Sequence, residues 1–285
     1  MKENRTDLAW EAHENWQGNS RRKSRIPGVT VQESNRDGFE ITGVRIQSKE
    51  GEKMLCKPIG RYITISVDPF LRREDESFQR GVKVTAELLR KLMGGEEKGS
   101  ALVVGLGNVQ ITPDALGPFT ARHVLATRHL LQQDPQHFRT FRPVSVLETG
   151  VLGTTGLESS EIVRDICRSI RPDLVIAVDA LAGNTLNRLC RTIQIADTGI
   201  VPGSGIGNSR QAMNRETLGV PVIAVGVPTV SCAVKERDGS CEKDMIVTPR
   251  DIDAAVRDMS RFLGYAINLA LQGGLTVSDL DLLIS

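Results

Sequence analysis

The stretch from Gly99 to Pro118 reads GSALVVGLGNVQITPDALGP, and it decides the fold. Its apolar run from Ala101 to Val104 leads directly into the turn GLGN, which is typical of a buried parallel strand that ends tightly. A polar loop with Asp114 follows, and helical spacing begins after Pro118. The stretch therefore predicts a strand, a loop and a helix, with the loop at the strand's carboxyl end, where open α/β sheets bind ligands.

Two later runs have the same form as this strand, namely LVIAVDAL from Leu174 and VIAVGVPT from Val222. Helical patterns separate the runs, including residues 75–93, one amphipathic helix between Pro118 and Pro135, and a long helix from about Thr248. These alternations predict an α/β fold with a mainly parallel central sheet and helices on both faces. The run LVIAVDAL is expected to form a strand over 174–178 that ends at Asp179.

The N-terminal part has a different character. Alternating runs between Gly28 and Ile46, separated by Asn35, Asp37 and Gly38, predict an antiparallel hairpin, and residues 60–67 (GRYITISV) predict a further strand. We therefore expect a β-hairpin-rich extension over about residues 26–70. Residues 1–25 are polar with a basic cluster at 21–25, which indicates a solvated, mobile segment or, less simply, a processing signal.

Composition narrows the class of protein. The chain has 285 residues, enough for one large domain, and its 36 basic and 35 acidic residues nearly cancel, so charge does not favour a nucleic-acid or membrane partner. Its 5 cysteines have no CxxC pair and are expected to be reduced thiols. No signal-peptide pattern or membrane-length apolar run occurs, so we expect a soluble, cytoplasmic protein.

Asp114 and Asp179 are the residues best suited to chemistry, because each follows an apolar strand pattern. If the strands are parallel, their ends meet at one sheet edge, where Asn108, Asp114, Asp179 and Thr229 can converge. Two carboxylates held close together share a proton, so one can act as an acid and the other as a base on water that attacks a peptide carbonyl. The simpler alternative is that each aspartate only caps a helix or a turn.

Other motifs give weaker signals. The GLGN turn lacks the third glycine of a dinucleotide fingerprint, and GSGIGN at residues 203–208 could form an anion nest but fits a substrate loop better. Ser204 has no histidine nearby in the sequence, and no zinc-binding motif such as HExxH occurs. A nucleotide-binding module without enzyme activity therefore remains a hypothesis at this point.

Long segments across nearly the whole chain carry a more specific signal: RTDLAWEAHE (5–14), GRYITISV (60–67), LVVGLGNVQITPDALGP (102–118), FRPVSVLETGVLGTTGLESSEIV (141–163), PDLVIAVDALA (172–182), IQIADTGIVPGSGIGNSR (193–210), ETLGVPVIAVGVPTV (216–230) and MIVTPRDID (245–253). They resemble the germination protease family of spore-forming Firmicutes, a family whose fold is similar to that of hydrogenase maturation proteases. A metal-dependent maturation protease of that second type is the alternative function.

The resemblance implies an endopeptidase that starts the degradation of small acid-soluble spore proteins during germination, located in the cytoplasm of the forespore and in the spore core. It also implies a zymogen, a homotetramer and an aspartic-type mechanism, with no cofactor, no metal, no direct nucleic-acid partner and no membrane. The family's two implicated aspartates match Asp114 and Asp179. Supporting or substrate-binding roles are expected for Gly107, Asn108, Asp197, Gly203, Ser204 and Gly205.

The N-terminus matches the family's cleavage pattern, in which a hydrophobic residue follows the cut in an acidic, Ala-containing motif. Residues 6–11 (TDLAWE) reproduce it, so we expect self-cleavage between Asp7 and Leu8. Residues 1–7 would then be a propeptide and residues 8–285 a single α/β protease domain. Trp10 is bulky for its place in the motif and is expected to slow processing. The connection over 231–245 is shorter than in longer family members, which carry an insert there.

Overall fold

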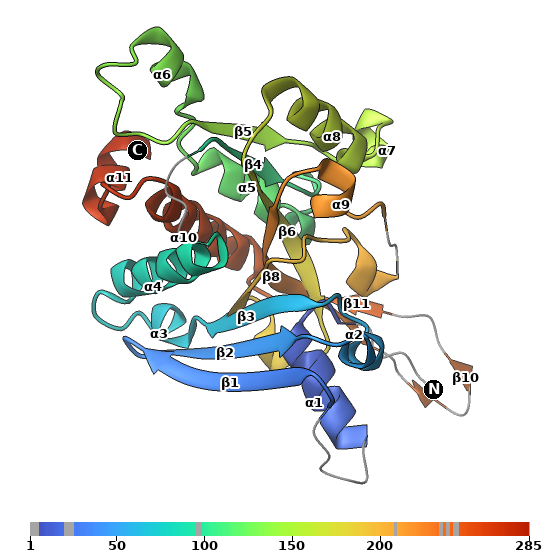
Figure 1. Ribbon diagram of the computed structural model, residues 1–285. Coiled ribbons are helices and arrows are strands. Elements are labelled where there is room, and N and C mark those ends of the chain that lie inside the picture. The colour runs from blue at the N-terminus through green and yellow to red at the C-terminus, as the bar shows by residue number, and fades with distance from the viewer. Residues whose placement is uncertain are drawn as a thin grey trace.

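The computed structural model describes residues 6–19, 26–94, 99–207, 210–233, 236–237, 240–241 and 245–284. One large sheet has the order β1-β2-β3-β7-β8-β6-β4-β5, with β11 also paired to β8 (Figure 1). Its strands are β1 (Val29–Arg36), β2 (Phe39–Ile46), β3 (Gly60–Ser66), β4 (Ala101–Gly105), β5 (Val144–Glu148), β6 (Leu174–Gly183), β7 (Thr192–Ala196), β8 (Val222–Ala233) and β11 (Met245–Val247). A separate small pair is formed by β9 (Glu236–Arg237) and β10 (Ser240–Cys241).

The α/β class is confirmed, but the direction of the strands differs from the expectation. The strands β5, β4, β6 and β8 are parallel, whereas β1, β2, β3, β7 and β11 join by antiparallel pairing. The expectation of a mainly parallel sheet is therefore wrong for the larger half. The reason is that the N-terminal hairpin extends the same sheet through β3 and β7, and each of these joins is antiparallel.

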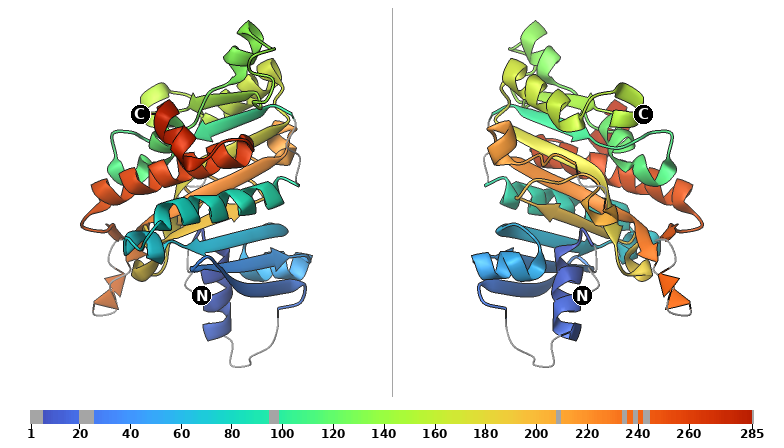
Figure 2. Two further views of the ribbon diagram at one scale, coloured as in Figure 1. Left: turned by 90° about the vertical axis from the view of Figure 1, so that its left-hand side faces the viewer. Right: turned by 90° about the vertical axis from the view of Figure 1, so that its right-hand side faces the viewer.

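The helices are α1 (Ala9–Asn19), α2 (Lys49–Leu55), α3 (Asp68–Leu71), α4 (Ser77–Leu92), α5 (Leu116–Arg122), α6 (Arg128–Gln133), α7 (Leu152–Thr155), α8 (Ser159–Ile170), α9 (Arg215–Leu218), α10 (Ile252–Leu271) and α11 (Val277–Ile284), with 3₁₀ turns η1 (Thr112–Asp114), η2 (Leu186–Arg188) and η3 (Ser204–Ile206). Figure 2 shows α4 and α10 along one face of the sheet. Among the described residues, no helix combines the length and apolarity needed to cross a membrane.

Alternating side chains explain why helices cover both faces. In β4, Ala101 and Val103 join the core beneath α4, α5 and α10, while Leu102 and Val104 join the core beneath α8 and α9. Successive residues of a strand point to opposite faces, so a strand that is apolar throughout needs cover on both sides. A third cluster packs α1 and α2 against β2, β3 and β7 on the same face as α8 and α9.

Two expectations about helices are corrected. Residues 118–135 form two short helices, α5 and α6, rather than one, because the chain leaves the helix at His123. The N-terminal segment is not wholly solvated: α1 is docked, with Leu8 and Ala9 fully buried. Tertiary contacts override its polar composition, which by itself gives little driving force for order. The basic cluster at 21–25 and most of the expected propeptide lie outside the described residues.

Candidate functional site

Asp179 lies inside β6 and not at the end of a strand as the sequence pattern predicts. The neighbouring strand β4 stops at Gly105, which pairs with Val178, whereas β6 continues beside β8 as far as Gly183. Asp179 is therefore the first residue of β6 beyond the end of β4, and it pairs with Gly226 of β8. It is only 5% exposed. The pairing of β6 with β8 fixes the backbone of Asp179 at the carboxyl edge of the short strand β4.

Asp114 reaches the same edge through the loop after β4. Gly107 has φ +114°, and a Cβ atom there would lie 2.0 Å from the backbone oxygen of Asp114, so only glycine fits this close approach. The Asn108 N–H donates to Asp114 Oδ2 at 2.7 Å. The Thr229 hydroxyl donates to the Pro113 carbonyl at 2.7 Å, which ties the loop to β8.

The two aspartates line one cavity of about 380 Å³. Asp7, from the N-terminal segment, also lines it, together with Gly107 and Gly203. Of the residues that the sequence analysis expects to converge, Asp114, Asp179 and Thr229 line this cavity, and Gly203 of the GSGIGN loop joins them.

Burial changes the acid–base properties of both aspartates. It raises the pKa of Asp179 well above the ordinary value, and the nearby negative charges of Asp114 and Asp7 raise it further, while the Ala180 N–H opposes the shift. Burial also raises the pKa of Asp114, opposed by the Asn108 N–H. Asp179 is therefore the carboxyl that more readily stays protonated, and Asp114 is the one that more readily ionises.

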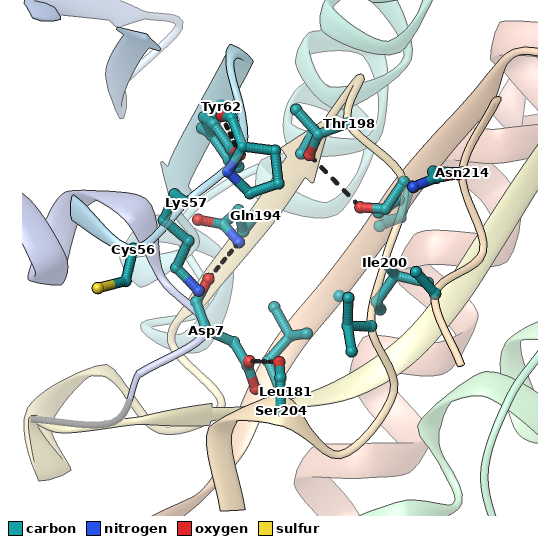
Figure 3. Close-up of a pocket in the computed structure, with 18 residues that line it drawn as sticks. Asp7, Cys56, Lys57, Tyr62, Leu181, Gln194, Thr198, Ile200, Ser204 and Asn214 are labelled. Carbon is teal, nitrogen blue, oxygen red and sulfur yellow. Dashed lines mark hydrogen bonds between the residues drawn. The ribbon is translucent and has the colours of Figure 1, made fainter. Parts of the chain in front are cut away.

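The N-terminal segment enters the site through Asp7. Its Oδ1 accepts a hydrogen bond from the Ser204 hydroxyl at 2.6 Å (Figure 3). Its Oδ2 accepts one from the Ala182 N–H at 2.8 Å. The Asp7 N–H in turn donates to the Ala182 carbonyl at 2.8 Å. A Cβ on Gly205 would lie 2.3 Å from Asp7 Oδ2, so this glycine leaves the space that the carboxylate fills.

The residues on either side of the Asp7–Leu8 bond are held as well. The Asp7 carbonyl accepts a hydrogen bond from Gln194 Nε2 at 2.9 Å, and the Ala9 N–H donates to Gln194 Oε1 at 2.7 Å. Leu8 between them is fully buried. Sequence reasoning missed Gln194, although a polar residue within the apolar strand TIQIA is a signal that could have found it.

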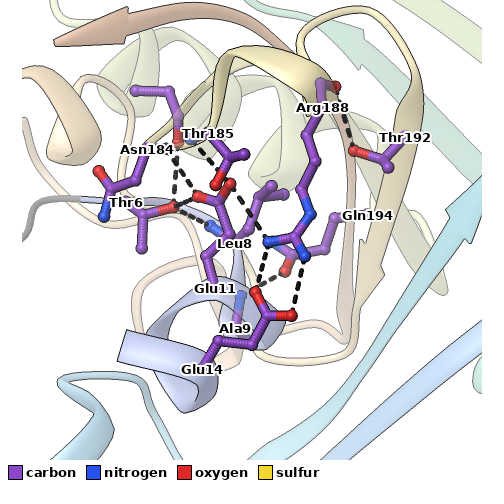
Figure 4. Close-up of polar contacts among 11 residues, drawn as sticks. Thr6, Leu8, Ala9, Glu11, Glu14, Asn184, Thr185, Arg188, Thr192 and Gln194 are labelled. Atoms are coloured by element: carbon purple, nitrogen blue, oxygen red, sulfur yellow. Dashed lines mark hydrogen bonds and ion pairs between the residues drawn. The ribbon is translucent and has the colours of Figure 1, made fainter. Parts of the chain in front are cut away.

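Glu11 anchors the start of α1 (Figure 4). It is 1% exposed and accepts hydrogen bonds from the backbone N–H groups of Asn184 at 2.7 Å and Thr185 at 3.1 Å. Arg188 pairs with it at 3.4 Å, and the same guanidinium stacks 3.9 Å from the centre of the Trp10 ring. The bulky Trp10 is thus accommodated on the surface of this anchor and not forced into the cavity.

Asp7 also lines a second cavity, of about 330 Å³. Figure 3 shows Lys57, Tyr62 and Gln194 around it. Burial lowers the pKa of the Lys57 ammonium, and the Asp7 carboxylate opposes this effect. Asp7 therefore borders both the cavity that holds Asp114 and Asp179 and the cavity that holds Lys57.

Some expected site residues are placed elsewhere. Asp197 does not line the cavity of Asp114 and Asp179; it accepts hydrogen bonds from the Arg61 N–H at 2.7 Å and from Arg61 Nε at 2.6 Å. Asn108 contributes its backbone N–H, while its side chain accepts from the Gln110 N–H. Asn208 of the GSGIGN motif lies outside the described residues. Within the ranges described, His, Cys, Asp and Glu form no group of three or more that could hold a metal ion.

Known proteins with similar sequences identify the class. The chain is a peptidase, since the sequence pattern of the family described as Germination protease matches residues 5–242. Germination proteases from Caldanaerobacter subterraneus subsp. tengcongensis and Clostridium tetani are 39% and 37% identical, over 98% and 97% of this chain and 98% of each relative. The Bacillus cereus (strain AH187) germination protease is 45% identical over 81% of this chain and 64% of its own length. The chain belongs to the germination protease family.

A solved structure that partly resembles this chain is the [NiFe] hydrogenase maturation protease HycI from Thermococcus kodakarensis KOD1. It is 18% identical, with a TM-score of 0.39, over 65% of this chain and 98% of that one. A similarity this low supports no functional inference. The sequence relatives favour the germination protease over the hydrogenase-maturation alternative.

Proposed function

We propose that this peptidase is an endopeptidase of aspartic type, with Asp114 and Asp179 as its catalytic pair. The observation that carries the proposal is that both carboxylates line one cavity that also receives Asp7, the residue before the expected cleavage point. The difference between their environments supports separate roles, because paired carboxylates work as acid and base when their pKa values are pushed apart.

The chemistry follows from these roles. Asp114 takes a proton from water while the water oxygen bonds to the peptide carbonyl carbon, and Asp179 gives its proton to the carbonyl oxygen. When the tetrahedral intermediate collapses, the C–N bond breaks, the leaving nitrogen takes the proton held by Asp114, and Asp179 recovers its own from a hydroxyl. Both groups return to their starting states, and one water is consumed for each bond cleaved.

The chain itself supplies the first substrate in this proposal. Residues 1–7 are a propeptide, and the Asp7–Leu8 bond is cut when the zymogen matures. Support comes from the hydrogen bonds of Asp7 with Ser204 and Ala182 at the edge of the cavity. While the bond is intact, Asp7 occupies the place that a protein substrate would need, so the uncut segment keeps the enzyme inactive.

Incubation of the full chain at mildly acidic pH is expected to produce a new N-terminus at Leu8, because acid keeps Asp179 protonated. Mass spectrometry of the intact protein and Edman sequencing measure this directly. The Asp179→Asn chain under the same conditions is the control and should keep residues 1–7. A cut at any other bond, or the same cut in the control, would contradict the proposal.

The proposed substrates of the mature enzyme are small acid-soluble spore proteins, degraded in the spore core by a homotetramer. Incubation of matured enzyme with such a protein, with and without a chelator, tests the substrate and the mechanism together. We expect cleavage that is equal in both arms and absent for Asp179→Asn. Cleavage lost on chelation would instead support metal-dependent catalysis.

A further inference from the structure

Gln194 bridges the two sides of the Asp7–Leu8 bond. Its Nε2 donates to the Asp7 carbonyl oxygen at 2.9 Å, and its Oε1 accepts from the Ala9 N–H at 2.7 Å. Only one orientation of the side-chain amide satisfies both contacts, since one partner is an acceptor and the other a donor. The amide therefore binds main-chain groups on both sides of the bond, whatever side chains stand there.

The sheet places Gln194 opposite Asp179. Both residues pair with Gly226 of β8, Gln194 from β7 and Asp179 from β6. Directly paired residues point to the same face, so the two side chains stand on one face of the sheet about 10 Å apart, two strand spacings. Asp7 contacts β7 through Gln194 and β6 through Ala182, and so lies between them.

Burial makes this donor effective. Gln194 is 7% exposed, and the adjoining Leu8 is fully buried. A buried amide needs partners, and both polar ends of this one find them in the N-terminal segment. A hydrogen bond aimed at a carbonyl from such a water-poor position is stronger than one in solvent, and it strengthens further as the oxygen gains negative charge.

We infer that Gln194 is a further catalytic residue, one that binds and polarises the carbonyl of the bond to be cut. The inference rests on the proposed cleavage of Asp7–Leu8. The carbonyl oxygen has two lone pairs, so Gln194 Nε2–H occupies one and the other remains for the proton from Asp179. As water adds to the carbonyl carbon, the hydrogen bond from Gln194 stabilises the developing charge and itself transfers no proton. A protein substrate presents the same main-chain groups and is held in the same way.

Two variants separate this role from simple anchoring of α1. Gln194→Glu keeps an oxygen that can accept from Ala9 and lacks a donor only when its carboxyl is ionised, whereas Gln194→Met keeps the side-chain length and loses both contacts at any pH. For each variant, the first-order rate of loss of the full-length chain at mildly acidic pH is expected to fall about 100-fold or more. Gln32→Met and Gln32→Glu, at an exposed glutamine of β1, are the matched controls and should process at the wild-type rate.

The melting temperature of each uncut variant tells loss of chemistry from loss of fold. Slow processing of a Gln194 variant that melts within a few degrees of wild type supports the inference, and Gln194→Met covers the case in which a buried charge from Gln194→Glu disturbs folding. Wild-type processing by Gln194→Met overturns the inference, because methionine offers the carbonyl no hydrogen-bond donor at any pH. If Asp179→Asn is inactive in that case, the proposed function stands without Gln194. A wild-type chain that never loses residues 1–7 overturns both.

Discussion

Asp179→Asn is expected to lower the rates of self-processing and of substrate cleavage at least about 1,000-fold, because the amide cannot cycle a proton. Asp114→Asn is expected to have an effect of the same order, since it removes the base. The rate of peptide-bond cleavage in matched incubations measures both. Asp165→Asn, which changes an exposed aspartate on α8, is the control and should leave the rate unchanged. Substantial activity in either site variant would remove the basis for a two-carboxylate mechanism.

Asp179→Asn is also expected to stabilise the folded state at neutral pH. The pKa of Asp179 is raised in the folded chain above its ordinary value of 3.8, so the folded state binds this proton more tightly than the unfolded state. The free energy of unfolding therefore falls as pH rises from the ordinary pKa through the raised one. Asparagine does not ionise, so the Asp179→Asn variant does not lose stability in this way as pH rises. Thermal melts of Asp179→Asn and wild type should agree in acid and diverge in favour of the variant as pH rises; a variant less stable at every pH would contradict this.

Gly107→Ala is the second substitution with a large expected effect. The methyl group would meet the backbone oxygen of Asp114 at 2.0 Å in a residue with φ +114°. The chain can relieve this only by moving the loop that carries Asp114. We expect a loss of about 2–4 kcal/mol in the free energy of unfolding and a fall in the cleavage rate of about 100-fold or more, measured by denaturant titration and by the cleavage assay.

Gly219→Ala separates backbone strain from displacement of Asp114. Gly219 also has a positive φ, +76°, but a Cβ there meets no atom within 4 Å. Its substitution should cost about 1 kcal/mol and leave the cleavage rate unchanged. If Gly107→Ala lost no more activity than Gly219→Ala, the loop would not position the catalytic carboxylate.

Much of the fold could be predicted because local patterns agree with tertiary structure there. The hairpin of β1 and β2, the strands β3, β4 and β5, and the helices α4, α8 and α10 follow directly from apolar periodicity. The lengths of β6 and β8 could not be predicted in this way. Their strand pairing continues past Asp179, and such pairing depends on a partner distant in the sequence.

Some residues of the candidate site could also be predicted from the sequence, and others could not. Asp114 and Asp179 could be found because each interrupts or follows an apolar run, and the motif around Asp7 and Leu8 could be found by resemblance. The placement of Asp197 with Arg61, away from the cavity, could not, since an ion pair between β3 and the segment after β7 leaves no local pattern. Gln194 was hidden because a single polar residue in a strand does not say which partner satisfies it.

By itself, the sequence determined that this chain is an α/β protein, which residues form its apolar strands, and that two aspartates follow or interrupt them, because side-chain alternation and turn chemistry act over a few residues. Only the tertiary structure decided that the sheet joins a parallel half to an antiparallel half, that Asp7, Asp114 and Asp179 line one cavity, and that Gln194 spans the Asp7–Leu8 bond. These features arise from strand pairing and burial between segments distant in the sequence, such as Asp7 and Ala182, which are 175 residues apart, and no local pattern encodes such contacts.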